Sequence, residues 1–440
     1  MKNMKRTLLI MLLACCGSAV AQVSVNYGAL EKKVAKSDAT IADPKKSLKD
    51  ATWLGRAELM FEVFNSQILN AYRGMTPENF NIIIGKPKSQ SNIDVEGVST
   101  DRYTMDRVEF YFVERSLEYW KVTQPVIKDA SPLDIARQSL EKAIELDAAG
   151  KKAKKIGDNL RTLKKLYLDE SLNYYSLKDY ANAYKSFKSC LEVGQMPQVN
   201  SVDTAVFYYA GLSAQLGGMY SEAISMYKQG LAVGFSSEGS AYFNMYEAYK
   251  AMGQNDEGVK CLEEGLVNYP QNLNILYSLI NCYLEKGEDP SKIIFYIDKA
   301  LVDAPDNVSL LFAKGTLYDK LEQYDEAVAV YTKATEVKPD FFDAYYNIGA
   351  VYYNKGVKLV EQANKVPASK VKEYEELVNQ ATAEFKKSIP YMEKAAEVNP
   401  QSKEAIEAVA NLYFRFRNES PEMLEKYNQF KAKLDELRQQ

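Results

Sequence analysis

Residues 308–341 read VSLLFAKGTLYDKLEQYDEAVAVYTKATEVKPDF. Two sets of residues in this stretch have helical spacing, and they are Leu311, Gly315 and Tyr318 in its first half and Ala327, Tyr331 and Ala334 in its second half. Each set lies on one face of a helix. The small residues let two helices approach closely, and the aromatic side chains fill the space between them. The stretch therefore predicts a helical hairpin.

The pattern recurs along the chain at a fixed interval. Pro270 and Pro305 are 35 residues apart, and Pro305 and Pro339 are 34 apart. Alanine precedes a proline by five residues at Ala300, Ala334 and Ala395. Proline cannot continue a helix, so each proline marks a turn into the next hairpin. A repeat of this length predicts an all-α solenoid, in which every hairpin buries its apolar face against its neighbours.

The residues resemble the tetratricopeptide repeat, a helix-turn-helix unit of 34 residues. Units in phase begin near Lys164, Thr204, Gly239, Leu273, Val308 and Phe342, and a further first helix begins at Lys403. Residues 345–356, YYNIGAVYYNKG, are similar to the first helix of the family. The resemblance covers residues 150 to 440 and implies a right-handed α-solenoid of about seven or eight units.

The chain is expected to have four parts. These are a signal peptide at 1–21, an N-terminal linker at 22–46, a first helical pair at 47–148, and the solenoid at 149–440 with a C-terminal capping helix. A β-rich insertion at about 74–130 splits the first pair, and a helical insertion at about 357–387 lengthens a late hairpin.

The N-terminus predicts export. Lys2, Lys5 and Arg6 precede an apolar run at 8–14, and Ala19-Val-Ala21 has the small residues of a signal-peptidase site. Gln22 at the new N-terminus resembles exported proteins of Bacteroidota, which implies the periplasm. The alternatives are secretion, or an outer-membrane lipoprotein attached through Cys15. Loss of residues 1–21 would lower the net charge from −4 to −7.

Composition argues against an enzyme. The chain has no histidine, which is the usual general base near neutral pH and the commonest nitrogen ligand of metals. It also lacks a glycine-rich phosphate loop, a Gly-x-Ser-x-Gly motif and a Cys-x-x-Cys pair. Carboxylate pairs could still hydrolyse glycosides, but solvated helix surface explains them more simply. We therefore expect no catalytic residues, no cofactor and no metal.

Mild acidity argues against nucleic acid as a partner. A basic segment runs against this trend, with lysine or arginine at 151, 152, 154, 155, 161, 164 and 165. It could receive an anionic partner, although a solvated helix face is the simpler interpretation.

After signal cleavage three cysteines remain, at 190, 261 and 282. They are expected to pack as small buried residues, with a disulfide between Cys261 and Cys282 as the alternative.

The β-rich insertion lies between an amphipathic helix at 49–73 and its partner at 132–146. Strands are predicted at 81–85, 107–114 and 117–123, where β-branched and aromatic residues gather, and Val108, Phe110 and Phe112 alternate in the second strand. Tyr111, Tyr119 and Trp120 are candidate recognition residues of the kind that dominate interfaces. The alternative is that they pack the sheet against the end of the solenoid.

The late hairpin is predicted to be unusually long. Pro339 and Pro400 are 61 residues apart, 27 more than one unit. Residues 357–363 continue the first helix, the second helix begins early at 371, and Pro367 marks the bend. The hairpin should project beyond its neighbours. It could contact a partner or a second copy of the chain, and the alternative is a tolerated surface elaboration. Pro390 should kink its second helix.

The resemblance also implies a groove lined by first helices. Its candidate residues are Tyr208, Phe243, Tyr277, Phe312 and Tyr346 at the fifth position of each unit, Asn281 at the ninth, and Tyr353 and Phe414 at the twelfth. An aromatic ladder with amides suits an extended peptide or a sugar chain. Ordinary packing is the competing explanation, because the family often has tyrosine at the fifth position. A protein-interaction scaffold of the cell envelope is the expected function, and carbohydrate binding or polysaccharide export is the alternative.

Overall fold

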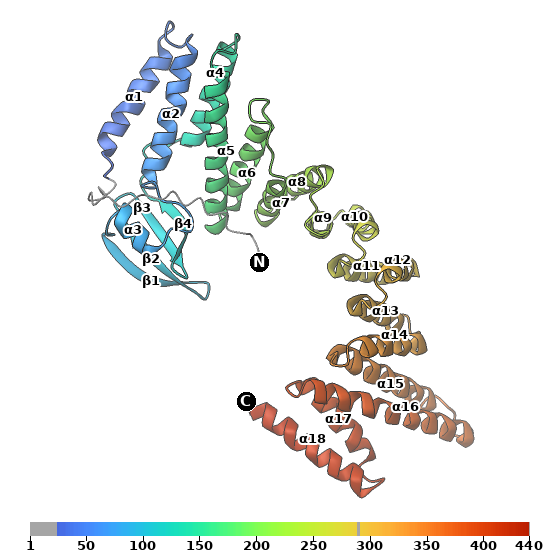
Figure 1. The fold of residues 1–440 in the computed structure, drawn as a ribbon. Coiled ribbons are helices and arrows are strands. Elements are labelled where there is room, and N and C mark those ends of the chain that lie inside the picture. The colour runs from blue at the N-terminus through green and yellow to red at the C-terminus, as the bar shows by residue number, and fades with distance from the viewer. Residues whose placement is uncertain (1–23, 288–290, 440) are drawn as a thin grey trace. The chain divides into compact units, whose positions relative to one another are not determined.

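The computed structural model describes residues 24–287 and 291–439. The predicted signal peptide at 1–21, with Cys15 and the cleavage site, lies outside the described residues. The chain divides into two compact units that meet in sequence between Phe235 and Ser236. Figure 1 labels the helices and strands of each unit.

The first unit contains the helices α1 Tyr27–Ala42, α2 Asp50–Gln67, α3 Pro77–Ile83, α4 Pro132–Leu146, α5 Ala153–Ser176, α6 Tyr180–Gln195, α7 Ala205–Leu216 and α8 Tyr220–Ala232. They pack in sequence order, apart from α3, which packs on the sheet. The antiparallel pairs are α2 with α4, α5 with α6, and α7 with α8. Helix α4 has the predicted bounds because Ser131 caps it and Pro132 occupies its first turn.

Residues 22–46 were expected to be a linker, and this prediction is wrong over α1. Asn26 caps the helix by accepting a hydrogen bond from the Ala29 amide at 3.0 Å. Arg56 on α2 is 8% exposed and pairs with Asp38 on α1 at 2.7 Å. Helix α1 therefore packs on the first helical pair.

The predicted small antiparallel sheet is confirmed. Its four strands, β1 Ser89–Val95, β2 Val98–Thr104, β3 Val108–Val113 and β4 Ser116–Val122, follow one another in sequence order. Glu114 and Arg115 have positive φ angles and form the tight turn before Ser116. Val108, Phe110 and Phe112 are buried as their alternation predicted. Phe80 of α3 packs edge-on against Phe110, with ring centroids 5.0 Å apart.

The strand predicted at 81–85 is wrong, because these residues fall in and just after α3. Thr76 caps α3 by accepting from the Asn79 amide at 3.3 Å, and Pro77 begins the helix. Gly85 follows with a φ of 108°. The cap and the proline thus outweigh the β propensity of the three isoleucines.

The second unit is helical among its described residues. Its helices are α9 Ser240–Ala251, α10 Asn255–Asn268, α11 Leu273–Lys286, α12 Ser291–Asp303, α13 Val308–Lys320, α14 Tyr324–Val337, α15 Phe342–Ala363, α16 Val371–Val398, α17 Lys403–Phe416 and α18 Pro421–Gln439. Consecutive helices pack as hairpins, and α18 closes the series by packing on α17 as the predicted cap. The handedness and number of repeat units stay predictions.

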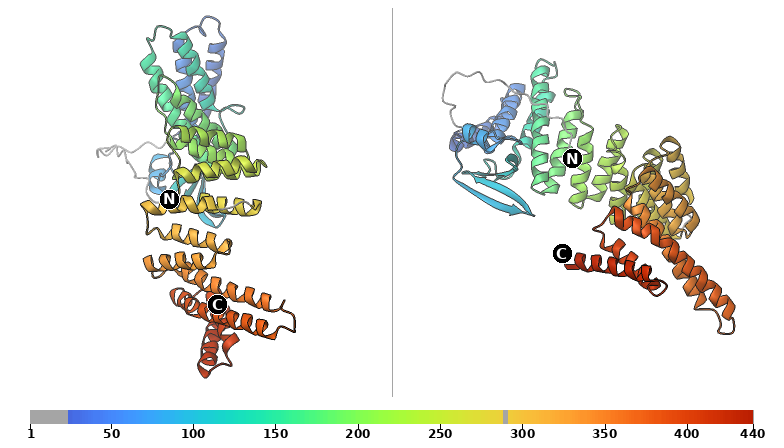
Figure 2. Two further views of the ribbon diagram at one scale, coloured as in Figure 1. Left: turned by 90° about the vertical axis from the view of Figure 1, so that its right-hand side faces the viewer. Right: turned by 60° about the horizontal axis from the view of Figure 1, so that its bottom comes forward.

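The long hairpin is confirmed. Helix α15 has 22 residues and α16 has 28, whereas α13 and α14 have 13 and 14. Figure 2 shows α15 and α16 extending beyond α13 and α14. Pro390 lies inside α16, and the helix continues through it from Val371 to Val398.

Candidate partner-binding surface

The predicted aromatic positions are half-buried rather than open. In the first unit, the Tyr208 ring lies 5.7 Å from the Tyr227 ring and 6.1 Å from that of Phe235. In the second unit, the fifth-position residues Phe243, Tyr277, Phe312 and Tyr346 are each partly exposed on the first helix of a hairpin. Because Tyr208 belongs to the other unit, the ladder is a feature of the second unit.

Phe312 shows how such a side chain is held. Its ring centroid lies 5.5 Å from that of Tyr331 on α14 and 5.3 Å from that of Phe341. The Tyr331 hydroxyl donates to Thr316 at 3.1 Å and accepts from the Asn347 amide at 3.2 Å. Phe312 therefore contributes to packing as well as to the surface.

Three other predicted residues are more accessible. Tyr353 on α15 is 37% exposed and Phe414 on α17 is 46% exposed. Asn281 is exposed on α11. Tyr353 packs against Phe385 at 5.3 Å, and the Arg417 guanidinium lies 3.6 Å from the centroid of the Phe414 ring. These two aromatic side chains are fixed by a neighbour and open to a partner.

The three candidate residues in the sheet differ in exposure. Trp120 is 4% exposed and lies in the core of the first unit, so its predicted role as a partner anchor is wrong. Tyr111 and Tyr119 are partly exposed and stacked, with centroids 4.6 Å apart. Burial and a hydrogen bond to Glu109 raise the pKa of Tyr111 to about 12. Burial also raises the pKa of Tyr119, so both phenols are protonated at neutral pH.

Trp120 is buried because α5 covers strand β4. The Asn173 side chain accepts from the Trp120 amide at 2.8 Å and donates to the Trp120 carbonyl at 3.0 Å. Arg73 reinforces this contact by bonding Glu118 on β4 and Ser176 on α5, each at 3.0 Å. At Trp120 the helix thus supplies two hydrogen bonds of the kind that a further strand would make, and residues 74 and 75 bond the backbone of Leu117 on the same strand. These residues carry no periodic signal in the sequence.

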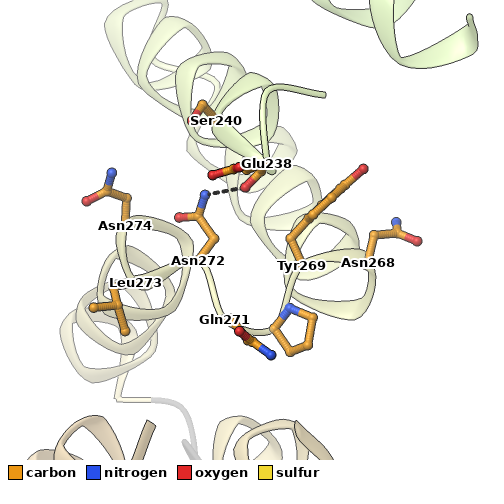
Figure 3. A pocket seen from close by; sticks show the side chains of 9 residues that line it. Glu238, Ser240, Asn268, Tyr269, Gln271, Asn272, Leu273 and Asn274 are labelled. Carbon is orange, nitrogen blue, oxygen red and sulfur yellow. Dashed lines mark hydrogen bonds between the residues drawn. The ribbon is translucent and has the colours of Figure 1, made fainter. Parts of the chain in front are cut away.

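A polar pocket of about 680 Å³ lies in the second unit, between the turn before α9 and the turn joining α10 to α11. Its lining, drawn in Figure 3, consists of Glu238, Ser240, Asn268, Tyr269, Pro270, Gln271, Asn272, Leu273 and Asn274. The sequence did not indicate this pocket, because scattered amides in a turn have no spacing to recognise.

The structure also places the cysteines and the basic segment noted in the sequence. Cys190, Cys261 and Cys282 are buried thiols that form no disulfide with one another. In the basic segment, Lys155 pairs with Glu58 at 2.8 Å and Arg161 with Asp158 at 2.8 Å.

Over the described ranges, no cluster of three or more acidic or cysteine side chains is placed to hold a metal ion. None of the helices described has the length and apolarity needed to cross a membrane.

The repeat family is found by comparison with known proteins. The family model described as TPR repeat matches residues 315–356, which cover the end of α13, all of α14 and most of α15. Residues 315–356 match the tetratricopeptide repeat. Repeats of this kind form extended surfaces that bind other proteins.

Several relatives match part of the chain. Protein O-mannosyl-transferase TMTC1 of Homo sapiens is 26% identical over 187 residues, which are 42% of this chain and 20% of that protein. TPR repeat-containing protein PA4667 of Pseudomonas aeruginosa is 31% identical over 111 residues, 25% of this chain and 19% of that protein. Photosystem I assembly protein Ycf3 of Prochlorococcus marinus is 31% identical over 114 residues, 24% of this chain and 66% of that protein. The chain spans about a fifth of the length of the first two relatives.

Solved structures of repeat proteins also align with the chain. A TPR repeats protein from Bacteroides fragilis covers 57% of this chain with 97% of its own, at 22% identity and a TM-score of 0.32. The C-terminal part of a TPR repeat-containing protein from Cytophaga hutchinsonii covers 60% of this chain with 92% of its own, at 15% identity and a TM-score of 0.39.

Proposed function

We propose that the protein is a non-enzymatic scaffold of the cell envelope, which holds a protein partner on the first helices of its second unit. The observation that carries this proposal is the set of accessible side chains on first helices, namely Asn281, Tyr353 and Phe414. Aromatic side chains give a large contact area and lose little conformational entropy on binding. Because a neighbouring ring or an arginine already fixes the two aromatic side chains, less entropy is lost on docking.

One of the relatives suggests an assembly role by its name. The Prochlorococcus relative is named an assembly protein for photosystem I. By analogy, this chain would hold components of an envelope complex together while they assemble. The stacked Tyr111 and Tyr119 on the sheet and the projecting hairpin would add contacts. Val371 and Tyr374 near the hairpin bend are 57% and 45% exposed.

We also propose export to the periplasm, on the basis of residues 1–21. Cell fractionation tests this location. The mature N-terminus should be Gln22, which N-terminal sequencing of the purified native protein would show. A lipid on Cys15 would establish the lipoprotein alternative, and recovery from the culture medium would establish secretion.

Affinity capture from envelope extracts tests the binding surface. The double variant Tyr353→Ala with Phe414→Ala should capture its partner at least tenfold less well, while its far-UV circular dichroism is retained. Phe295→Ala is the matched control, because Phe295 is 64% exposed on α12, a second helix of a hairpin. Equal loss of capture in the control, or full capture by the double variant, would contradict the proposed surface.

Phe312 should not be used for this test by itself. Its ring packs against both Tyr331 and Phe341 and is less exposed than that of Tyr353, so Phe312→Ala should lower the stability of the second unit as well as any binding. Phe312→Ala is therefore expected to lower the thermal midpoint, and it cannot separate binding from folding.

A further inference from the structure

The turn before α9 has an unusual backbone. Ser237, Glu238 and Gly239 have φ angles of 50°, 56° and 88°, so three consecutive residues lie in the left-handed region. This region is unfavourable for residues that carry a Cβ atom, and such conformations persist where the surrounding structure holds them. Strained turns of this kind often occur at binding sites.

Contacts with the turn between α10 and α11 hold the strained residues in place. The Asn272 side-chain amide donates to the Glu238 carbonyl at 2.9 Å (Figure 3). A Cβ atom on Gly239 would lie 2.9 Å from the Tyr269 Cβ atom, so the two turns are in close contact there. The Ala241 amide donates to the Ser236 carbonyl at 3.1 Å and closes the turn.

The two turns together form the polar pocket, and its chemistry is distinctive. Among the described residues that line it, none is lysine or arginine, and Glu238 is the one carboxylate. Asn272 is used for structure, because its Oδ1 atom caps α11 by accepting from the Ile275 amide at 3.1 Å. Gln271 and Asn274 are exposed, and each offers a carbonyl oxygen and an NH₂ group at the pocket.

We propose that this pocket binds an uncharged, hydroxyl-rich ligand, namely a neutral oligosaccharide. A sugar hydroxyl both donates and accepts hydrogen bonds. A side-chain amide can accept through its carbonyl oxygen and donate through its NH₂ group. The Glu238 carboxylate accepts strongly from hydroxyl groups and repels anionic ligands. Tyr269 is half-buried at the pocket and supplies an apolar surface for the carbon-bound hydrogens of a sugar ring. The pocket does not depend on the aromatic surface proposed above to bind a protein.

Calorimetric titration of the intact protein tests the proposal. The probes are cellohexaose, laminarihexaose, maltohexaose and chitotetraose, with trigalacturonic acid as an anionic probe of similar type. At least one neutral probe should bind, and the acid should bind at least tenfold more weakly than that probe. Gln271→Ala and Asn274→Ala should each weaken binding of the neutral probe three- to tenfold, and the double variant should abolish it.

Asn354→Ala is the matched control, because Asn354 is an exposed amide on α15 outside the pocket. It should bind the neutral probe with unchanged affinity. Circular dichroism and the thermal midpoint of all variants should match those of the parent, since Gln271 and Asn274 are exposed.

Two results would overturn the proposal. One is that none of the four neutral probes binds at millimolar concentration. The other is that binding occurs but is equally strong in the Gln271 and Asn274 double variant. If that double variant instead loses capture of a protein partner, the amides hold a peptide backbone. Failure of the sugar titration leaves capture by Tyr353 and Phe414 unaffected, so the two proposals can fail separately.

Discussion

At the residue scale, glycine decides how closely the helices of a hairpin approach. A Cβ atom built on Gly211, Gly315 or Gly349 would lie 2.7, 2.6 or 2.7 Å from a side-chain atom of Tyr227, Tyr331 or Met392. Such distances are shorter than van der Waals contact allows. The large side chain of the second helix therefore rests directly on the backbone of the first.

Gly211→Ala should destabilise the first unit by about 1–3 kcal/mol, because the new methyl group overlaps the buried Tyr227 ring. Gly55→Ala is the matched control, since Gly55 is also inside a helix but a Cβ atom there would meet nothing within 4 Å. It should be neutral or stabilising by up to about 1 kcal/mol. Urea denaturation measures both, and equal midpoints for the two variants would refute the overlap.

Glu170 on α5 should make the first unit less stable as the pH rises. Burial raises its pKa to about 7, against a partly compensating hydrogen bond from Ser186 at 2.7 Å. The folded state then binds a proton that the unfolded state has released between pH 4.5 and about 7. The free energy of unfolding should fall across this interval, by at most about 3 kcal/mol, and level off above it.

Glu170→Gln should remove that fall and be more stable than the parent at pH 8, because its side chain stays neutral. Urea midpoints between pH 4 and 8 measure the difference. Glu145→Gln serves as the control, since Glu145 is exposed on α4 and pairs with Lys142 at the surface. A pH profile shared by the parent and Glu170→Gln would show that Glu170 ionises normally.

At the element scale, the sheet has two unlike edges. Helix α5 covers β4 through Asn173, whereas β1 pairs with β2 and has polar, mostly exposed residues. A bare edge strand is a site where other chains can pair. The Lys-Pro-Lys sequence at 86–88, directly before β1, has the charges and proline that discourage such pairing.

Asn173→Ala should loosen the sheet from α5. It leaves the buried amide and carbonyl of Trp120 without their partner, at a cost of about 1–3 kcal/mol. Hydrogen exchange measured by mass spectrometry should be faster in residues 116–122 of the variant. Asn159→Ala, on the same helix, should leave that exchange unchanged, because its side chain reaches Glu58 rather than the sheet. Unchanged exchange in Asn173→Ala would show that the other contacts of β4 hold it without Asn173.

Elements whose first residues carry clear boundary signals could be predicted from the sequence. The starts of α4, α13, α15, α16 and α17 coincide with the predicted residues, where a cap, a proline or the repeat phase marks them. Strands β1 and β2 were missed because their polar residues, such as those at 89–92, show no apolar alternation. Recognition and packing could not be separated for Trp120 because a sequence pattern does not show that α5 covers β4.

The candidate surface was predictable in position but not in exposure. Repeat phase placed Phe312 and Tyr353 on first helices, and both lie there. Their different accessibility depends on neighbours such as Phe341 and Phe385, which come from other segments. The amide pocket was not predictable at all, since two turns distant in sequence form it.

At the scale of the whole molecule, the reactivity of the three described cysteines shows whether the protein is folded. Cys261 and Cys282 are buried thiols whose sulfur atoms contact Tyr242 and Tyr246. In mature protein beginning at Gln22, a thiol reagent such as DTNB should therefore react with no cysteine in buffer and with three in denaturant. Reaction of a single thiol in denaturant would establish the disulfide alternative between Cys261 and Cys282.

The hydrogen bonds between α5 and strand β4 also limit how such a chain can evolve. Repeat proteins lengthen and shorten by duplicating or losing whole hairpins. Here the insertion inside the α2 and α4 pair is bonded to the next pair through Asn173. A hairpin copied in between would separate the two and leave Trp120 unsatisfied. These two pairs should therefore be inherited together, and changes in repeat number should occur after α6.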